Sequence, residues 1–284
     1  MEEQALSVSN LTKRFGGFTL DNVSFDLPKG CIMGLIGSNG AGKTTLLKCI
    51  LGLVNMNSGE IRIFGKDNRT ELSRTDVGAV FDEEVLPRDS TPEQVAKIVS
   101  LLFDTWDDEL YREMCQRFDI PMKKIKHLSK GMKVKLQIAL AFAHRPKLLI
   151  MDEPAAGLDP AAREELYDLF AEFISDGERS VVVSTHLTDD LDRIADYILF
   201  LNGGETVFYS EKDRIIEDYG IVKCTSDEYL QLDQEHVINR RNGDYGISVL
   251  ISDKRGYREA YPELTIDDAR LSDIIIMILR GEMI

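Results

Sequence analysis

The sequence predicts an α/β fold, and two features of the chain lead to that prediction. The apolar runs 148–151 and 181–183 have the length and composition of strands buried on both faces, and the stretch 160–174 between them has a helical pattern. Earlier in the chain, the apolar run 31–36 is followed by a glycine-rich loop and then by a helical stretch, 44–53. Strands that alternate with helices are typical of a parallel sheet covered by helices.

The remaining elements fit around this core. Pairs of short strands are expected at three places, 6–9 with 18–20, the segment 59–65, and 197–201 with 206–208. Of these, the first pair flanks the turn 15–17 and indicates an antiparallel start. A helical pattern extends from about 91 to 143 and begins at Thr91-Pro92, a helix cap followed by proline in the first turn.

The length of the chain leaves room for a second, smaller domain. With 284 residues, 43% of them hydrophobic, the chain can bury a large core. We predict a main domain over 1–210, with a helical subdomain at about 88–143, and a C-terminal accessory domain of α+β type over 211–284. In the accessory domain, 246–251 is expected to be a strand and 266–275 a capped amphipathic helix.

The charge of the chain argues against two classes of partner. The net charge is −15, and no basic block suits a phosphate backbone, so nucleic acid is not an expected partner. The same acidity opposes direct lipid insertion, and the apolar run 274–279 is far shorter than the roughly 20 residues of a membrane span. The first residues lack the features of a signal peptide, so we expect a cytoplasmic protein.

The glycine-rich loop carries the strongest local signal. It fits the pattern GxxxxGK[ST] and consists of Gly37, Ser38, Asn39, Gly40, Ala41, Gly42, Lys43, Thr44 and Thr45. Glycines let backbone N–H groups curl around phosphates, Lys43 can reach the β and γ oxygens, and Thr44 can hold Mg²⁺. Since a strand precedes the loop and a helix follows it, the loop predicts nucleotide binding, but it does not by itself choose between GTPases, kinases and ATPases.

Two acids follow the apolar run 148–151 directly. Asp152 would lie at the carboxyl end of a strand, where it can hold Mg²⁺, and Glu153 would face the γ-phosphate and polarise the attacking water. The alternative is a solvated acidic pair, which is common at strand ends. Their spacing from the phosphate loop favours the catalytic role.

Further motifs give the chain a specific resemblance. Leu128-Ser129-Lys130-Gly131-Met132 precedes the acid pair, Gly157-Leu158-Asp159 follows it, and Ser184-Thr185-His186 follows the next strand. With these motifs in order over about 5–210, the chain resembles the ATP-binding subunits of ABC transporters, in particular those of bacterial antibiotic or multidrug efflux. The family signature is usually LSGGQ and here reads LSKGM.

The resemblance implies a fold and a set of roles. The fold would be a phosphate-loop ATPase with a mixed RecA-like core, an antiparallel β subdomain and a helical subdomain. Phe15 would stack on adenine, Asp159 would belong to the nucleotide site, and His186 would sense the γ-phosphate. Taken alone, His186 would be read as a buried structural histidine. The family usually has glutamine at the position of Asp82, which is expected to be a metal ligand, and its shorter charged side chain would either bind the metal more directly or fall short of it.

The signature is expected to act between two copies of the chain. Ser129 and Gly131 open a helix whose N-terminal N–H groups suit an anion, although a cap that serves only its own helix is the alternative for Ser129. In the family, this helix end closes over the γ-phosphate bound by a second subunit. A homodimer that sandwiches two ATP molecules is therefore expected.

Three functions are open to a chain with these motifs. The first is an ATPase that powers a separate membrane permease, an exporter by resemblance, and that lies on the inner face of the membrane through that permease. The alternatives are non-transport ABC ATPases, either of DNA repair, which need a coiled-coil or zinc insertion and a basic surface, or of translation, which carry two tandem cores. Because the sequence has neither set of features, transport is the expected function.

Overall fold

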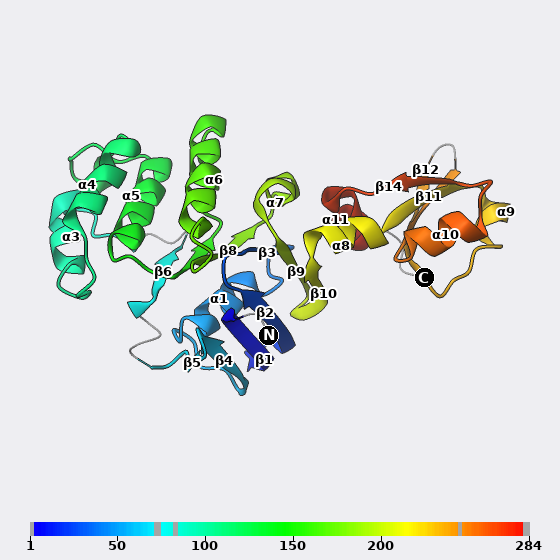
Figure 1. Ribbon diagram of the computed structural model, residues 1–284, viewed down its shortest axis with the longest axis horizontal. Helices are drawn as coiled ribbons and strands as arrows, with labels where there is room; N and C mark the ends of the chain where they lie inside the picture. The colour runs from blue at the N-terminus through cyan, green and yellow to red at the C-terminus, as the bar shows by residue number, and fades with distance from the viewer. Residues whose placement is uncertain (1–2, 71–74, 82–84, 244–245, 281–284) are drawn as a thin grey trace. The chain divides into compact units, whose positions relative to one another are not determined.

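The computed structural model describes residues 3–70, 75–81, 85–243 and 246–280 (Figure 1). The chain divides into two compact units. The first contains Met1–His186 and Tyr197–Tyr209, and the second contains Leu187–Asp196 and Ser210–Ile284.

The first unit begins with an antiparallel sheet of order β2-β1-β4-β5. Its strands are β1 (Gln4–Arg14), β2 (Thr19–Pro28), β4 (Ser58–Ile63) and β5 (Lys66–Asp67). Strands β1 and β2 pair antiparallel, which confirms the antiparallel start expected from the sequence. Leu6, Leu11 and Leu20 on these strands are fully buried and anchor the sheet to the core.

A six-stranded sheet of order β10-β9-β3-β8-β7-β6 forms the centre of the unit. Its strands are β3 (Ile32–Gly37), β6 (Val77–Val80), β7 (Leu148–Asp152), β8 (Ser180–Thr185), β9 (Tyr197–Asn202) and β10 (Glu205–Glu211). Strands β3, β7 and β8 are buried along their whole length and pair in parallel. Their carboxyl ends therefore meet at one edge of the sheet, and the loops that follow them converge there.

Helices of the first unit occupy the stretches that the sequence indicated. They are α1 (Lys43–Ile50), α3 (Pro92–Val99), α4 (Asp108–Arg117), α5 (Lys130–Ala143) and α6 (Pro160–Ile174). The expected start of α3 is confirmed, since Thr91 caps it and Gln94 closes a capping box. Helices α3, α4 and α5 form the helical region seen in green in Figure 1.

The second unit is built on an antiparallel sheet of order β12-β13-β11-β14. Its strands are β11 (Gly220–Cys224), β12 (Val237–Gly243), β13 (Gly246–Ile251) and β14 (Thr265–Asp268). Its helices are α7 (Thr188–Ile194), α8 (Lys212–Asp218), α9 (Ser226–Tyr229), α10 (Lys254–Ala260) and α11 (Leu271–Arg280). The unit is thus α+β, and it includes α7, which precedes β9 in the chain.

One prediction for this unit is wrong. The stretch 266–275 was expected to form a single helix, but its first residues belong to β14, and α11 begins only at Leu271. Strand β14 pairs with β11, where Ile266 lies opposite Val222. Pairing with a neighbouring strand outweighs the local helical pattern at this point. None of the helices in the described part of the chain is long and apolar enough to cross a bilayer.

Candidate active site

The phosphate loop connects β3 to α1 and curls around a cavity of about 480 Å³. Gly40 and Gly42 have φ angles of 83° and 107°, a backbone conformation that glycine adopts without strain. The cavity is lined by Phe18, Ser38, Asn39, Gly40, Ala41, Gly42, Lys43, Thr44, Thr45, Asp152 and Glu153. The structure therefore brings the predicted loop and the predicted acid pair into one site.

Lys43 lies within the loop, and its side chain is buried. Its ammonium group donates a hydrogen bond to the carbonyl oxygen of Gly37 at 2.8 Å. The same nitrogen lies 3.8 Å from a carboxylate oxygen of Glu153. Lys43 thus places a positive charge between the loop and the acid pair, where it can bind phosphate oxygens.

Asp152 ends β7 and is 7% exposed, so the alternative of a solvated acidic pair does not hold for it. The hydroxyl of Thr44 donates to Asp152 Oδ2 at 2.6 Å. The second carboxylate oxygen of Asp152, Oδ1, accepts a hydrogen bond from the hydroxyl of Ser184 near the end of β8. Both carboxylate oxygens are therefore fixed by neighbouring elements.

Glu153 follows Asp152 in a left-handed backbone conformation, with φ of 52°. Such a conformation costs a residue with a side chain about 1–2 kcal/mol and clusters at functional sites. The turn directs its carboxylate to His186, whose Nδ1 lies 2.7 Å from Glu153 Oε2. A carboxylate can only accept here, so the imidazole donates.

His186 is not the buried structural histidine that its type alone would suggest. Its side chain is 54% exposed, while that of Glu153 is 19% exposed. The histidine thus covers the carboxylate on one side and presents the rest of its ring to solvent. The pair can hold a water molecule or a phosphate oxygen at the edge of the loop cavity.

The donor set around Asp152 fits Mg²⁺. In the described part of the chain, no three His, Cys, Asp or Glu side chains group closely enough to hold a metal alone. Magnesium seldom needs such a cage, because it takes one or two protein oxygens and completes its shell with phosphates and water. The Thr44 hydroxyl and the Asp152 carboxylate, in contact with each other at the loop, supply that kind of partial shell.

The signature residues lie outside the lining of this cavity. Ser129 caps α5 and accepts a hydrogen bond from the N–H of Met132 at 3.2 Å. Within one copy of the chain it therefore serves its own helix, as the alternative interpretation of this residue expects. Gly131 lies against the turn before α6, since an added Cβ would be 3.3 Å from the carbonyl oxygen of Gly157. Asp159 caps α6 by accepting the N–H of Ala162 at 2.9 Å. None of these three residues lines the phosphate-loop cavity.

One further predicted residue, Phe15, is not among those that line the cavity. Phe15 is 49% exposed and lies under the ammonium group of Lys13 at 4.9 Å, while Phe18, from the same turn, lines the cavity. Asp82 lies outside the described residues. The adenine-stacking role of Phe15 and the metal role of Asp82 stay predictions.

Reasoning from the sequence missed two residues of the site. Phe18 was read only as part of a short strand, although its ring packs on Gly42, and Ser184 only as part of the run before His186. The one available signal for Ser184 was a polar residue near the end of an otherwise apolar strand.

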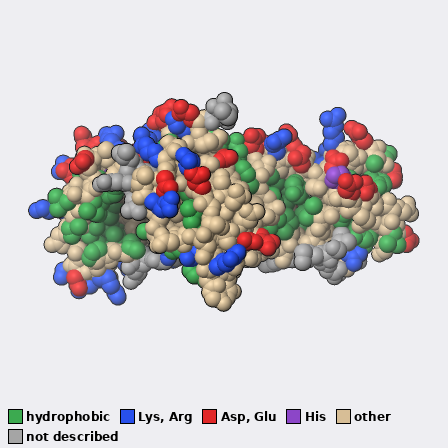
Figure 2. Space-filling view, turned by 90° about the horizontal axis from the view of Figure 1, so that it is seen from below, with side chains coloured by type: hydrophobic (Ala, Val, Ile, Leu, Met, Phe, Trp, Pro, Cys, Tyr) green, Lys and Arg blue, Asp and Glu red, His purple; other side chains and the backbone are tan. Residues whose placement is uncertain are grey.

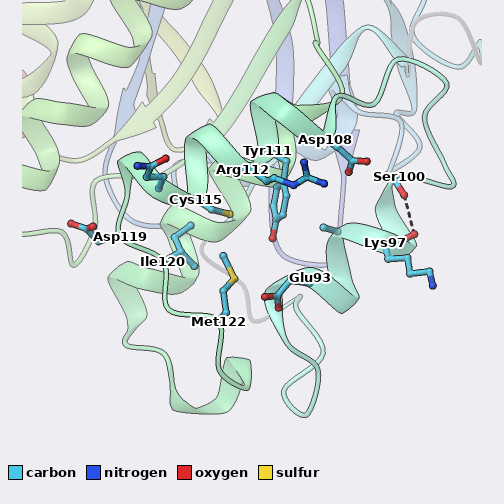
Figure 3. A pocket seen from close by; sticks show the side chains of 12 residues that line it. Glu93, Lys97, Ser100, Asp108, Tyr111, Arg112, Cys115, Asp119, Ile120 and Met122 are labelled. Carbon is cyan, nitrogen blue, oxygen red and sulfur yellow. Dashed lines mark hydrogen bonds between the residues drawn. The ribbon is translucent and has the colours of Figure 1, made fainter.

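A larger cavity, of about 740 Å³, lies between α3 and α4. In Figure 3, Tyr111 from α4 points toward Glu93 of α3 and toward Met122, with Cys115 beside it. Burial raises the pKa of Tyr111 well above its ordinary value, so its hydroxyl stays protonated. None of the motif residues lines this cavity, so we assign the nucleotide to the smaller one at the phosphate loop.

Comparison with known proteins identifies relatives of this chain. The family model described as ABC transporter matches residues 20–156. The lantibiotic transport ATP-binding protein SrtF of Streptococcus pyogenes is 34% identical over 212 residues, which cover 73% of this chain and 91% of SrtF.

Solved structures agree with these matches. The structure of an ATP-binding subunit of an ABC transporter has a TM-score of 0.69 at 29% identity, covering 75% of this chain and 92% of its own. The cbiO1 protein of Clostridium perfringens, part of the ABC transporter complex cbiONQ, has a TM-score of 0.62 at 25% identity, covering 74% of this chain and 89% of its own. The predicted fold is confirmed by both.

Proposed function

Since this chain belongs to the family of ABC transporter ATP-binding subunits and is an ATPase, we propose that it powers a separate membrane permease through ATP-driven closure of a dimer. The observation that carries the proposal is the meeting of the phosphate loop, Asp152, Glu153 and His186 at one edge of the central sheet.

Each side chain of the site has a proposed task. The loop N–H groups and Lys43 bind the phosphates, and Thr44 and Asp152 hold Mg²⁺, which when bound neutralises developing charge on the phosphates. Glu153 orients the attacking water and accepts its proton, and His186 fixes the Glu153 carboxylate and contacts the γ-phosphate. The contacts among these groups support this division.

A second copy of the chain is the proposed partner at the signature. Ser129 is exposed and lies at the start of a 14-residue helix, where N–H groups and the helix dipole favour an anion. Because these residues do not line the cavity of their own copy, we propose that they complete the site of a second copy.

An exposed apolar surface on the helical region supports a protein partner. At the end of α3, Ile98, Leu101 and Leu102 are 57%, 82% and 70% exposed. In the view of Figure 2, hydrophobic side chains gather around a hollow in the part of the molecule that carries α3 and α4. Exposed apolar groups of this kind mark interaction sites, and we propose that the permease contacts them and holds the chain at the membrane.

Transport by export is the proposed direction. The Nod factor export ATP-binding protein I of Sinorhizobium fredii, 28% identical over 226 residues, is named for export, and SrtF is named for lantibiotic transport. The resemblance to efflux ATPases points in the same direction, so a permease that moves a compound outward is the partner we expect.

Substitution of Glu153 by glutamine tests the proposed mechanism. The amide keeps the size of the side chain but cannot take a proton from water, so we expect ATP binding to persist while turnover falls by about 10²- to 10⁴-fold. Bound ATP that is not hydrolysed should trap the closed dimer, which size-exclusion chromatography with ATP would detect.

A matched control is Glu205→Gln, the same chemical change at an exposed residue at the start of β10. This variant should turn over ATP at the wild-type rate and should not accumulate a dimer. Wild-type hydrolysis by Glu153→Gln would overturn the role given to Glu153.

A further inference from the structure

One buried hydroxyl connects the two acids of the site. Ser184 lies near the end of β8 and is fully buried. Its hydroxyl donates to Asp152 Oδ1, and its oxygen accepts the backbone N–H of Glu153 at 3.1 Å. A hydroxyl has one hydrogen to donate and lone pairs to accept, so a single side chain makes both bonds.

The backbone of Glu153 depends on the same residue. Its N–H also lies 3.1 Å from the carbonyl oxygen of Ser184, so the left-handed turn at Glu153 is tied to β8 by two acceptors of one residue. A residue in such a sparsely populated conformation persists only where its surroundings hold it. Ser184 belongs to those surroundings and contacts both Asp152 and Glu153.

The two oxygens of Asp152 therefore have different neighbours. Thr44 contacts Oδ2 at the side of the phosphate loop, while Ser184 contacts Oδ1 from inside the sheet. A carboxylate held at its inner oxygen presents its outer oxygen in a fixed direction. Partners of this kind orient metal ligands in many proteins, and their loss typically lowers metal affinity or activity about 10- to 100-fold.

We propose that Ser184 is a positioning residue, which aims the Asp152 carboxylate at Mg²⁺ and sets the turn that aims Glu153 at the attacking water. The inference rests on the roles proposed above for Asp152 and Glu153. It adds that one hydroxyl determines the orientation of both acids, so metal binding and water activation are coupled through β8.

The same strand provides a matched control. Ser180 begins β8, is also fully buried, and donates its hydroxyl to the carbonyl oxygen of Pro28 at 3.2 Å. Replacing either serine by alanine removes buried hydrogen bonds of β8, one at Ser180 and two at Ser184. Of the two serines, only Ser184 contacts the acid pair.

The test compares Ser184→Ala with Ser180→Ala in the full chain. For Ser184→Ala we expect kcat to fall about 10- to 100-fold with little change in the binding of ATP measured in EDTA. With a non-hydrolysable ATP analogue, the affinity of the complex for Mn²⁺, read by electron paramagnetic resonance, should fall by a similar factor. Ser180→Ala should match the wild type in kcat and in Mn²⁺ affinity, although both variants lose thermal stability.

The outcomes separate this inference from the proposed function. Wild-type kcat and Mn²⁺ affinity in Ser184→Ala, with Glu153→Gln inactive, would overturn the role of Ser184 and leave the proposed function standing. Active Glu153→Gln would overturn the proposed function itself. If Ser184→Ala does not fold, Ser184→Cys keeps the shape of the side chain with a larger atom and a weaker donor. We expect lower kcat and Mn²⁺ affinity from it, and wild-type values would again overturn the inference.

Discussion

Gly42 is the N-cap of helix α1 and has a φ of 107°, and an added Cβ there would lie 2.9 Å from the ring of Phe18. The glycine therefore meets two separate demands, a left-handed backbone and close contact with an aromatic ring. Gly203, in the turn between β9 and β10, meets only the first, since its φ is 57° and no atom lies within 4 Å of an added Cβ. Comparing substitutions at the two glycines therefore separates the effect of backbone strain from that of the contact with Phe18.

Alanine at these two glycines should have different effects. Gly203→Ala should cost about 1–2 kcal/mol of stability from strain alone, with ATP affinity unchanged. Gly42→Ala should lose more stability and also at least about 10-fold in ATP affinity, because the loop must shift away from Phe18. Thermal unfolding and nucleotide titration measure the two quantities, and equal ATP affinity in both variants would contradict the contact argument.

The residues that carry local chemistry were predictable from the sequence, and those that act through three-dimensional contact were not. Lys43, Asp152 and His186 stand in recognisable motifs, and the structure places all three at one edge of the sheet. Ser184 reaches the site only because β8 pairs with β7, and Phe18 only because the turn before β2 packs on Gly42, so no short motif marks them.

At the scale of elements, buried parallel strands were the easiest to predict. Strands β7 and β8 contain apolar runs that are buried on both faces. Because the two strands pair in parallel, the loops that follow them lie close together. Strand β14 was missed because four residues with two acids give little strand pattern, and the pairing with β11 is made by residues more than 40 positions away in the chain.

The end of helix α5 shows how an element can be sensitive to pH. His144 is the C-cap of α5, is 3% exposed and stacks on Phe103 with ring centroids 4.1 Å apart. Burial lowers the pKa of His144 from 6.5 to about 4. The folded protein therefore holds this histidine neutral at a pH where the unfolded chain protonates it.

We expect this histidine to contribute stability that is full above pH 6.5 and is lost as the pH falls toward 4, because over that range only the unfolded chain takes up the proton. The loss should approach about 3 kcal/mol. His144→Phe keeps an aromatic ring beside Phe103 and should flatten the pH dependence of the free energy of unfolding between pH 6.5 and 4. Denaturant titrations measure it, with the exposed His127→Phe as control, and an unchanged slope in His144→Phe would contradict the assignment.

At the scale of the whole molecule, exposed leucines occur in each of the two compact units. Leu101 and Leu102 lie beyond α3 in the first unit, and Leu230, 79% exposed, follows α9 in the second. A chain with a net charge of −15 is repelled by anionic lipid. This charge supports the proposal that a protein contact, at the surface of the helical region, attaches the chain to a membrane.

Aspartate at both Leu101 and Leu102 should break that contact and spare catalysis. Burial of one exposed leucine in an interface is worth about 1.5–3 kcal/mol, so the double variant should lose most of the membrane protein that co-purifies with tagged wild-type chain. Its ATPase rate in solution should stay at the wild-type level, because neither residue lines the phosphate-loop cavity. Leu230→Asp, the same change on the second unit, should retain the co-purifying protein. Quantitative mass spectrometry of membrane extracts makes the comparison, and equal recovery of the partner by the double variant and by Leu230→Asp would show that the permease binds elsewhere.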